Sequence, residues 1–203
     1  MLDRMVETAR QREIFCREDT PTEQRVLAAF LYPAGLSYRK IEPFVDRSYE
    51  AVRQWYHRLS GLFEPDRDDR PVVAVDETKI AINGEERYVW AAIDTDTFEA
   101  VHVEVSAGRS SLDALLFLKE VLKRCRGQPL IKVDRGPWYE WPLEELPCEY
   151  EQETWGKRSL VEALFGLVKY RTMLFWHRFP VNSSIRSTDR WIKSFAALLN
   201  AIL

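Results

Sequence analysis

Hydrophobic positions follow two different periods along this chain, and the change between them separates a helical first third from a strand-rich middle. Up to about residue 62 the apolar residues recur at spacings of three and four, as on one face of a helix. From Val72 onward, short runs rich in valine, isoleucine and aromatic residues alternate with turn residues, as in strands. The pattern predicts an α/β fold in which a small all-α domain precedes a mixed sheet with flanking helices.

Helices are predicted throughout the first third. Residues 1–19 predict a short helix, and the stretch from Thr20 to Glu23 predicts the start of a second, with Thr20 as its N-cap and Pro21 in the first helical position. Ser37 and Ser48 are placed to cap two further helices. The last of these helices has an apolar stripe made of Val52, Trp55, Tyr56 and Leu59.

Three short helices with a tight turn before the last are typical of a helix-turn-helix, whose last helix enters the major groove of DNA. Polar side chains at the exposed N-terminal face of that helix would bond phosphates or base edges. In this chain they are Arg47, Ser48, Tyr49, Arg53, Gln54 and His57. An ordinary three-helix packing unit with a solvated polar face has the same periodicity, so the hydrophobic pattern leaves both interpretations open.

The stretch from Gly61 to Pro71 contains a glycine, two prolines and a cluster of charges, with few residues to bury. Such a composition is typical of a linker or a domain boundary. We therefore expect a first domain over residues 1–62, a linker over 63–71 and a second domain over 72–203.

The second domain is predicted to begin with a strand, Val72 to Val75, that leads into Asp76. Asn83 and Gly84 predict a tight hairpin turn into a second strand, because both turn residues must adopt positive φ. An isolated buried charge is costly, so a carboxylate on such a strand either closes a polar network or binds a ligand.

A third strand from Ala100 to Val105, a helix from Ser110 and a fourth strand from Leu130 to Val133 complete the predicted sheet. A strand that follows a crossover helix tends to lie parallel to an earlier strand. If it pairs with the first strand, Asp134 at its end lies beside Asp76, and the two carboxylates outline a metal site.

After Asp134 the sequence is punctuated by prolines and is expected to be irregular until a strongly periodic helix from Ser159 to Arg171. Arg158, Glu162 and Lys169 share one face of this helix. The alternative to a functional carboxylate is a helix-surface glutamate paired with a cation. A last amphipathic helix is expected to pack on the sheet through Trp191, Phe195, Leu198 and Ile202.

Composition adds constraints on partners and location. The net charge of −3 is uneven, with +1 over residues 1–62, −9 over 63–152 and +5 over 153–203. An acidic centre between less acidic flanks fits a metal-binding core with nucleic-acid-contacting edges, and it equally fits a salt-adapted acidic protein. The three cysteines form no CxxC pair, so neither a disulfide framework nor a structural zinc site is indicated. Without a signal peptide or a long apolar run, a cytoplasmic protein with no membrane partner is expected.

Several stretches together resemble the DDE transposases with an RNase H-like fold, and among these the transposases of insertion-sequence family six. They are VDET at Asp76, VDRG at Asp134, and KRSLVEALFGLVKYRT with Glu162 and Lys169. The tract RYVWAAID, the helix-turn-helix pattern and the tail FWHRFPVNSS extend the resemblance over about residues 20 to 203. The gap between Asp134 and Glu162 is shorter than is usual in the wider superfamily.

The resemblance implies an RNase H-like sheet and a transposase that binds insertion-sequence ends, cleaves DNA and transfers the strands. Asp76, Asp134 and Glu162 would be the catalytic acids and would hold two Mg²⁺ ions, bridged by Asp76, for which Mn²⁺ would substitute. Lys169 and Arg158 would hold DNA phosphate nearby. The expected partners are inverted-repeat ends, target DNA and further copies of this chain, as a homodimer or a larger assembly on DNA.

Two alternatives to a transposase remain open from the sequence. One is a catalytically inactive DNA-binding relic or regulator, which would keep the same fold and the same helix-turn-helix. The other is a nuclease of the same fold that cuts DNA without joining it.

Overall fold

The structure, a computed structural model, describes residues 2–16, 19–152, 159–172, 178–179 and 182–202. The chain divides into two compact units. One comprises Met1–Glu64 together with Arg190–Leu203, and the other comprises Pro65–Asp189. We call them the helical unit and the sheet unit.

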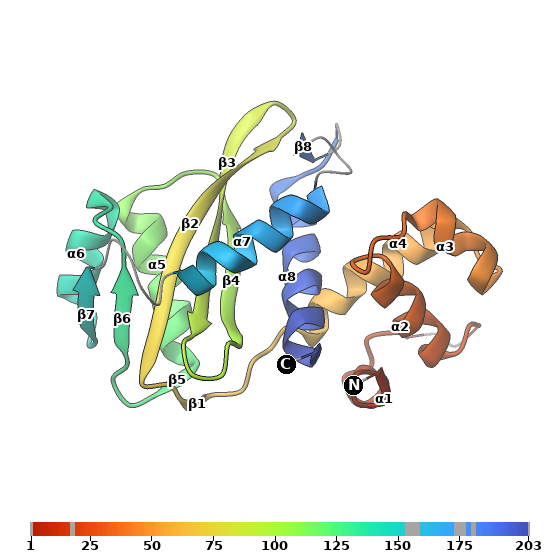
Figure 1. The fold of residues 1–203 in the computed structure, drawn as a ribbon, viewed down its shortest axis with the longest axis horizontal. Coiled ribbons are helices and arrows are strands. Elements are labelled where there is room, and N and C mark those ends of the chain that lie inside the picture. The colour runs from red at the N-terminus through yellow and green to blue at the C-terminus, as the bar shows by residue number, and fades with distance from the viewer. Residues whose placement is uncertain (1, 17–18, 153–158, 173–177, 180–181, 203) are drawn as a thin grey trace. The chain divides into compact units, whose positions relative to one another are not determined.

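The helical unit begins with the predicted helices (Figure 1). They are α1 Leu2–Gln11, α2 Thr22–Leu31, α3 Tyr38–Val45 and α4 Tyr49–Arg58, followed by the short 3-10 helix η1 Leu59–Leu62. The hydroxyl oxygens of Ser37 and Ser48 accept hydrogen bonds from the backbone N–H groups of Lys40 and Ala51, both at 3.3 Å, which confirms the two predicted caps. Asp46, with φ 48°, makes the tight turn between α3 and α4.

The predicted cap of α2 is wrong. The helix begins at Thr22, and the residue before it, Pro21, has extended angles and makes no side-chain cap. The Thr20 hydroxyl oxygen instead accepts a hydrogen bond from Nε of Arg47 at 2.9 Å. A tertiary partner on the turn before α4 has therefore displaced the local cap.

Most of the last helix, α8 Ile185–Ile202, belongs to the helical unit. The indole N–H of Trp191 donates to the Tyr32 hydroxyl at 3.2 Å, and the Tyr56 hydroxyl donates to the Trp191 carbonyl oxygen at 3.1 Å. The Ser194 hydroxyl donates to the Tyr56 carbonyl oxygen at 2.7 Å. These bonds give this part of the helix partners at Tyr32 and Tyr56, which the sequence did not indicate, because an amphipathic pattern identifies an apolar face without identifying its partner.

The sheet unit contains the predicted strands and helices and several short additional elements. They are β1 Asp68–Asp69, β2 Val72–Ile82, β3 Glu85–Asp94, β4 Ala100–Ser106, α5 Ser111–Lys123, β5 Cys125–Arg126, β6 Leu130–Val133, α6 Pro137–Glu145, β7 Glu149–Gln152, α7 Ser159–Thr172 and β8 Arg178–Phe179.

The main sheet has the strand order β4-β3-β2-β6-β7, and β8 pairs with β2 outside this order. Strands β2, β3 and β4 are antiparallel neighbours, whereas β6 runs parallel to β2 and β7 runs parallel to β6. Strands β1 and β5 form a separate parallel pair. The predicted RNase H-like mixed sheet with flanking helices, preceded by an all-helical region, is confirmed.

The hairpin between β2 and β3 forms where the sequence predicts it. Asn83 and Gly84 have φ of 53° and 81°, the positive values that such a turn requires. The two strands then pair continuously from Val73 opposite Asp94 to Ile82 opposite Glu85.

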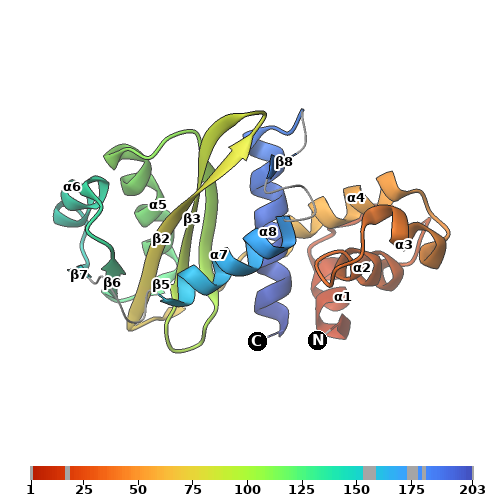
Figure 2. The same cartoon turned by 45° about the horizontal axis from the view of Figure 1, so that its top comes forward.

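Helices cover both faces of the main sheet (Figures 1 and 2). On one face, α5 packs against side chains of β2, β3 and β4 in a buried apolar core that includes Val73, Val75, Trp90, Val101, Phe117 and Leu118. On the opposite face, α7 contacts β2 and β3. Its buried side chains are Val161, Leu164, Phe165 and Val168.

The stretch after Asp134, expected to be irregular, forms α6 and β7. Pro137 occupies the first turn of α6, where its missing N–H has no helical partner to lose. Tyr139 and Leu143 are buried in the core shared with α5, so tertiary packing stabilises a helix that its prolines argue against.

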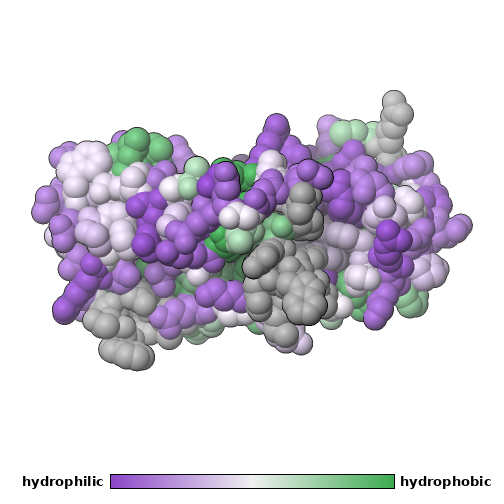
Figure 3. Space-filling view, turned by 90° about the horizontal axis from the view of Figure 1, so that it is seen from above, coloured by the Kyte–Doolittle hydropathy of each residue, from purple (hydrophilic) through white to green (hydrophobic). Residues whose placement is uncertain are grey.

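The face of the molecule shown in Figure 3 is predominantly hydrophilic. On the face shown in Figure 3, apolar side chains form separate patches among hydrophilic ones. The large exposed apolar side chains come from several elements, for example Phe44 of α3, Leu112 and Leu116 of α5, and Tyr170 of α7. Within the described ranges, no helix is both long and apolar enough to cross a bilayer.

Candidate active site

The pairing of β2 with β6 aligns the two predicted catalytic aspartates. Val72 lies opposite Leu130, and Ala74 lies opposite Lys132, in a parallel register. Extended by two residues, to Asp76 on β2 and to Asp134 directly after the end of β6, the same register sets the two aspartates opposite each other. The prediction that the fourth strand lies parallel to the first and beside it is confirmed.

Both aspartates face the side of the sheet that α7 covers. Val75 of β2 and Val133 of β6 point into the core on the α5 side. Because side chains alternate between faces along a strand, the next residue of each strand, Asp76 or Asp134, points to the opposite face. The core residues that precede the two carboxylates therefore determine their direction.

Backbone N–H groups orient both carboxylates. Asp76, whose exposure is 7%, accepts a hydrogen bond at Oδ1 from the N–H of Glu77 at 2.9 Å. Asp134 is half-buried and accepts one at Oδ1 from the N–H of Gly136 at 2.8 Å. Each bond fixes the direction of one carboxylate oxygen.

The buried phenol of Tyr139 responds to the negative charges of the carboxylates around it. The pKa of Tyr139 is raised well above its ordinary value, first by burial, next by the neighbouring Glu77, and then by Asp76 and Asp134. Tyr139 therefore stays protonated and donates its hydrogen bond to Oε2 of Glu77 at 2.7 Å.

Glu162, the third predicted acid, lies in the first turn of α7 and is exposed. The N-terminal end of α7 lies beside β2 in both ribbon views (Figures 1 and 2). In the part of the chain that the structure describes, no three acidic, histidine or cysteine side chains are grouped closely enough to hold a metal ion. The structure thus brings Asp76 and Asp134 together but does not bring Glu162 into one group with them.

The structure describes one of the two predicted phosphate-binding cations, Lys169. Lys169 is exposed on α7, seven residues after Glu162 and therefore on a similar face of the helix. Arg158 lies outside the described residues.

Two of the residues expected to contact DNA also stabilise the turn before α4. The Arg47 guanidinium donates to the carbonyl oxygens of Asp46 and Asp19 at 2.7 and 3.2 Å, in addition to its bond to Thr20. The Ser48 hydroxyl caps α4. The cap made by Ser48 was predicted from the sequence, whereas the structural role of Arg47 was not.

The remaining residues expected to contact DNA lie on α4. Tyr49 and Gln54 are exposed. The Arg39 guanidinium lies over the Tyr49 ring, 4.4 Å from the ring centroid. Arg53 is exposed and pairs with Glu50, one turn earlier, at 2.6 Å. An exposed pair of this kind contributes little to stability, so exchanging it for a phosphate contact costs little.

His57, the last of these residues, is half-buried. Burial, followed by the positive charges of Arg53 and Arg190, lowers its pKa to about 4, although Glu50 opposes the shift. The imidazole is therefore neutral near pH 7 and would act there as a hydrogen-bonding group rather than as a cation.

A match to a family model decides the family of the chain. The model, described as a DDE domain, matches residues 71–173, which include all three predicted acids. This chain belongs to the DDE domain family. An uncharacterized protein of Methanocaldococcus jannaschii is 40% identical over 195 residues, covering 94% of this chain and 91% of that protein.

Further similarities cover smaller parts of the DDE protein or are weaker. An uncharacterized protein of Aquifex aeolicus is 40% identical over 81 residues, which cover 40% of this chain and 63% of that protein. The solved intasome of simian T-cell lymphotropic virus, in complex with PP2A regulatory subunit B56 gamma, has a TM-score of 0.47 at 15% identity, with 76% of this chain and 67% of that chain covered. The HTLV-2 integrase catalytic core domain in complex with magnesium has a TM-score of 0.46 at 14% identity, with 62% and 85% covered.

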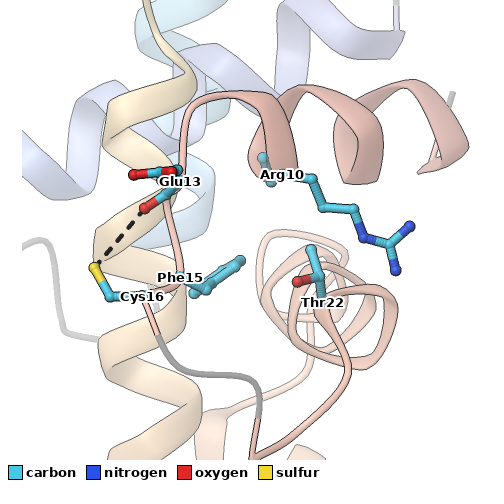
Figure 4. Close-up of a pocket in the computed structure, with 6 residues that line it drawn as sticks. Arg10, Glu13, Phe15, Cys16 and Thr22 are labelled. Carbon is cyan, nitrogen blue, oxygen red and sulfur yellow. Dashed lines mark hydrogen bonds between the residues drawn. The ribbon is translucent and has the colours of Figure 1, made fainter.

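The helical unit of this DDE protein contains a pocket formed by α1, the start of α2 and the segment between them (Figure 4). Its volume is about 310 Å³, and its lining residues are Ala9, Arg10, Glu13, Phe15, Cys16 and Thr22. The Cys16 thiol lies 3.9 Å from the carbonyl oxygen of Glu13, and Arg10 pairs with Glu23 at 2.6 Å. Its lining contains none of the predicted catalytic or DNA-contacting residues.

Sequence reasoning missed one carboxylate of the DDE domain. Glu77 follows Asp76 directly but points to the opposite face of β2, where its side chain is 3% exposed. It accepts hydrogen bonds from Arg109 at 3.1 Å, from the indole of Trp138 at 3.3 Å and from Tyr139 at 2.7 Å. The available signal was a second acid immediately after a buried run, which alternation directs into the core on the α5 and α6 side.

Proposed function

We propose that this protein is a transposase of insertion-sequence family six, which binds the ends of its element and catalyses DNA cleavage and strand transfer with divalent cations. The observation that carries the proposal is the parallel register of β2 and β6 within a DDE domain. It aligns Asp76 and Asp134 on one face of the sheet, where the carboxylates of neighbouring strands can share a ligand.

The donor set fits a hard divalent cation. Asp76 and Asp134 offer carboxylate oxygens on adjacent strands, each oriented by one backbone N–H, and such oxygens are the protein ligands that Mg²⁺ and Mn²⁺ prefer. In the proposal Asp76, Asp134 and Glu162 would together hold two Mg²⁺ ions. When bound, Mg²⁺ would lower the pKa of the attacking water or 3′-hydroxyl and offset charge on the leaving oxygen.

The chain's own residues bind and orient the DNA in this proposal. Lys169, exposed on α7, contacts a phosphate of the strand to be cut, and Arg158 does the same from the segment before α7. Residues 1–62 form the domain that recognises the inverted-repeat ends, residues 63–71 link it to the catalytic domain, and 72–203 form that domain. No protein nucleophile is required, because water and the DNA 3′-hydroxyl are the attacking groups.

Recognition of the ends is assigned to α4. Its exposed Tyr49, Arg53 and Gln54 contact DNA, and His57 adds a neutral hydrogen-bonding group. Arg47 and Ser48 hold the turn that sets the direction of the helix. Since two ends must be brought together, the active form is a homodimer or a larger assembly on DNA.

One observation favours a second candidate, a DNA-binding regulator that does not cleave. Over the described residues Glu162 is not grouped with the two aspartates, so the third carboxylate is not in place in the structure. In the regulator, the helical unit would bind the ends and the DDE domain would serve only as a scaffold.

The experiment that separates the candidates is a nicking and joining assay with Mg²⁺, on DNA that carries the element's ends together with a target plasmid. Nicked ends joined to the target support the transposase. Nicked ends that are never joined support a nuclease of the same fold, and binding without nicking supports the regulator. An Asp134→Asn variant run in parallel shows whether any cleavage comes from this site.

A further inference from the structure

Behind the two aspartates, on the opposite face of the sheet, lies a buried polar cluster around Glu77. We call it the Glu77 cluster; its other members are Arg109, Trp138 and Tyr139. Glu77 is the acceptor for all three, with Oε1 bonded to Arg109 and Oε2 bonded to both aromatic side chains. A carboxylate buried to this extent would be strongly destabilising without such donors.

The cluster fixes the position of the Trp138 indole. The indole N–H donates to Glu77 at 3.3 Å, and the Arg109 guanidinium lies 3.8 Å from the ring centroid on its face. A cation over an indole face is a favourable arrangement. The ring is thus held both at its edge and on its face.

The fixed indole lies directly against the backbone that orients Asp134. A Cβ added to Gly136 would lie 2.5 Å from two ring atoms of Trp138, so only glycine permits this approach. The N–H of Gly136 is the group that donates to Oδ1 of Asp134 at 2.8 Å. The bond that orients Asp134 therefore depends on where the indole lies.

The other end of the cluster is adjacent to Asp76. Glu77 follows Asp76 on β2, and its own N–H donates to Oδ1 of Asp76 at 2.9 Å. One residue thus contacts Asp76 through its backbone and reaches Asp134 through its side chain, by way of Trp138 and Gly136.

We propose that Glu77 is a positioning residue, which holds the Asp134 carboxylate beside Asp76 through the contacts of Trp138 and Gly136 and so prepares the pair to bind a divalent cation. This proposal rests on the proposed function, because the cation that the two aspartates would bind is the one required for DNA cleavage. Glu77 contacts neither substrate nor cation. It acts by restricting the loop between β6 and α6.

The test is Glu77→Gln in the full chain, with two readouts that require no DNA chemistry. Glutamine keeps the volume but turns one acceptor oxygen into a donor, so it cannot accept from Arg109, Trp138 and Tyr139 together. We expect the Gly136 amide to exchange with solvent roughly tenfold faster in the metal-free protein. We expect the dissociation constant for Mn²⁺, measured from the free-ion EPR signal, to rise roughly tenfold, as is typical when outer partners of metal ligands are lost.

Asp94→Asn is the matched control. Asp94 is also buried, at 2% side-chain exposure, and also pairs with an arginine, Arg70, at 3.1 Å. Its register partner on β2 is Val73, three residues before Asp76. This variant loses a buried arginine–carboxylate pair of the same kind in the same unit, so general destabilisation appears in both variants, whereas loosening of Gly136 and weaker Mn²⁺ binding appear only in Glu77→Gln.

Trp138→Phe keeps the proposal testable if Glu77→Gln fails to fold. The phenyl ring lacks the N–H that bonds to Glu77 and also lacks the indole atoms that lie nearest Gly136, so we expect changes of the same sign. Wild-type values for both Gly136 exchange and Mn²⁺ affinity, in whichever variant folds, would overturn the proposal. If Mn²⁺ binding by the wild type is unaffected by Asp134→Asn, the proposed function fails instead, and Gly136 exchange alone decides the positioning role.

Discussion

The close contact between Gly136 and Trp138 makes Gly136→Ala a quantitative test of the active-site architecture. Gly136 has φ −64° and ψ 127°, values that any L-residue adopts readily. The new Cβ, however, would lie 2.5 Å from two indole atoms of Trp138. The indole cannot turn aside without losing its bond to Glu77 and its contact with Arg109.

The magnitude follows from two opposing effects. Replacing glycine by alanine at a compatible backbone conformation stabilises by about 0.4–1 kcal/mol, through the lower entropy of the unfolded chain. Forcing an extra carbon into a packed site costs about 1–3 kcal/mol. We therefore expect Gly136→Ala to lower the free energy of unfolding of the sheet unit by about 1–2 kcal/mol, and to weaken Mn²⁺ binding because Asp134 loses its alignment.

The assay is urea unfolding of the full chain, followed through amide signals of β2, β3 and β4. Gly166→Ala is the control: Gly166 is exposed on α7, and an added Cβ there meets no atom within 4 Å. In a helix this change should stabilise by about 0.5–1 kcal/mol. A lower free energy of unfolding for Gly136→Ala and a higher one for Gly166→Ala would establish the steric argument, because the two substitutions are chemically identical.

A double variant tests the cause. In a Trp138→Ala background the clash is absent, so adding Gly136→Ala should no longer destabilise. Wild-type stability and wild-type Mn²⁺ affinity in the single variant Gly136→Ala would refute the argument that the indole constrains this loop.

Three further variants test other parts of the account. Glu162→Gln should abolish Mg²⁺-dependent nicking while DNA binding and the urea midpoint stay near wild type; nicking at the wild-type rate would exclude Glu162 as a catalytic acid. Arg53→Ala should weaken binding to the element's ends, in a gel-shift titration, more than it slows joining of pre-nicked DNA, and equal losses would contradict a separate recognition role for α4. Because the pKa of His57 is about 4 in the folded protein, against an ordinary 6.5, the unfolded chain binds the proton first. The contribution of neutral His57 to the free energy of unfolding is therefore complete above pH 6.5 and is lost as the pH falls towards 4, by about 3 kcal/mol in all. His57→Gln should flatten the pH dependence of the free energy of unfolding in urea over that range. An unchanged pH dependence would show that other groups cause it.

The parts of the fold that sequence predicted correctly are those governed by local rules. Asn83 and Gly84 specify their turn because few residues tolerate positive φ. Ser37 and Ser48 cap their helices because their hydroxyls reach an N–H three residues later. The pairing of β6 with β2 follows from the preference for parallel pairing after a crossover helix, and with it comes the alignment of Asp76 and Asp134.

The errors and omissions come from contacts between residues distant in sequence. Arg47 removes Thr20 from its expected capping role, and packing on α5 stabilises α6 despite Pro142. The sequence of α8 shows an apolar face but does not show that Trp191 bonds to Tyr32.

The candidate site shows the same limit. The residue types and the strand ends predicted Asp76 and Asp134, because alternation and register are local properties. The role of Glu77 depends on three donors, of which Arg109 precedes α5 and the other two lie on α6. Spacing along the chain gave no indication that these donors would converge.

The most direct test of the central claim is single-turnover joining of pre-cut element ends to target DNA with Mg²⁺, comparing Asp76→Asn with Asp96→Asn. Both variants replace one carboxylate of the sheet unit by an amide, but Asp96 lies in the exposed turn between β3 and β4. The account predicts that the joined product disappears in Asp76→Asn and persists in Asp96→Asn. Joining by Asp76→Asn at the wild-type rate would contradict the assignment of the active site to Asp76 on β2 and Asp134 after β6.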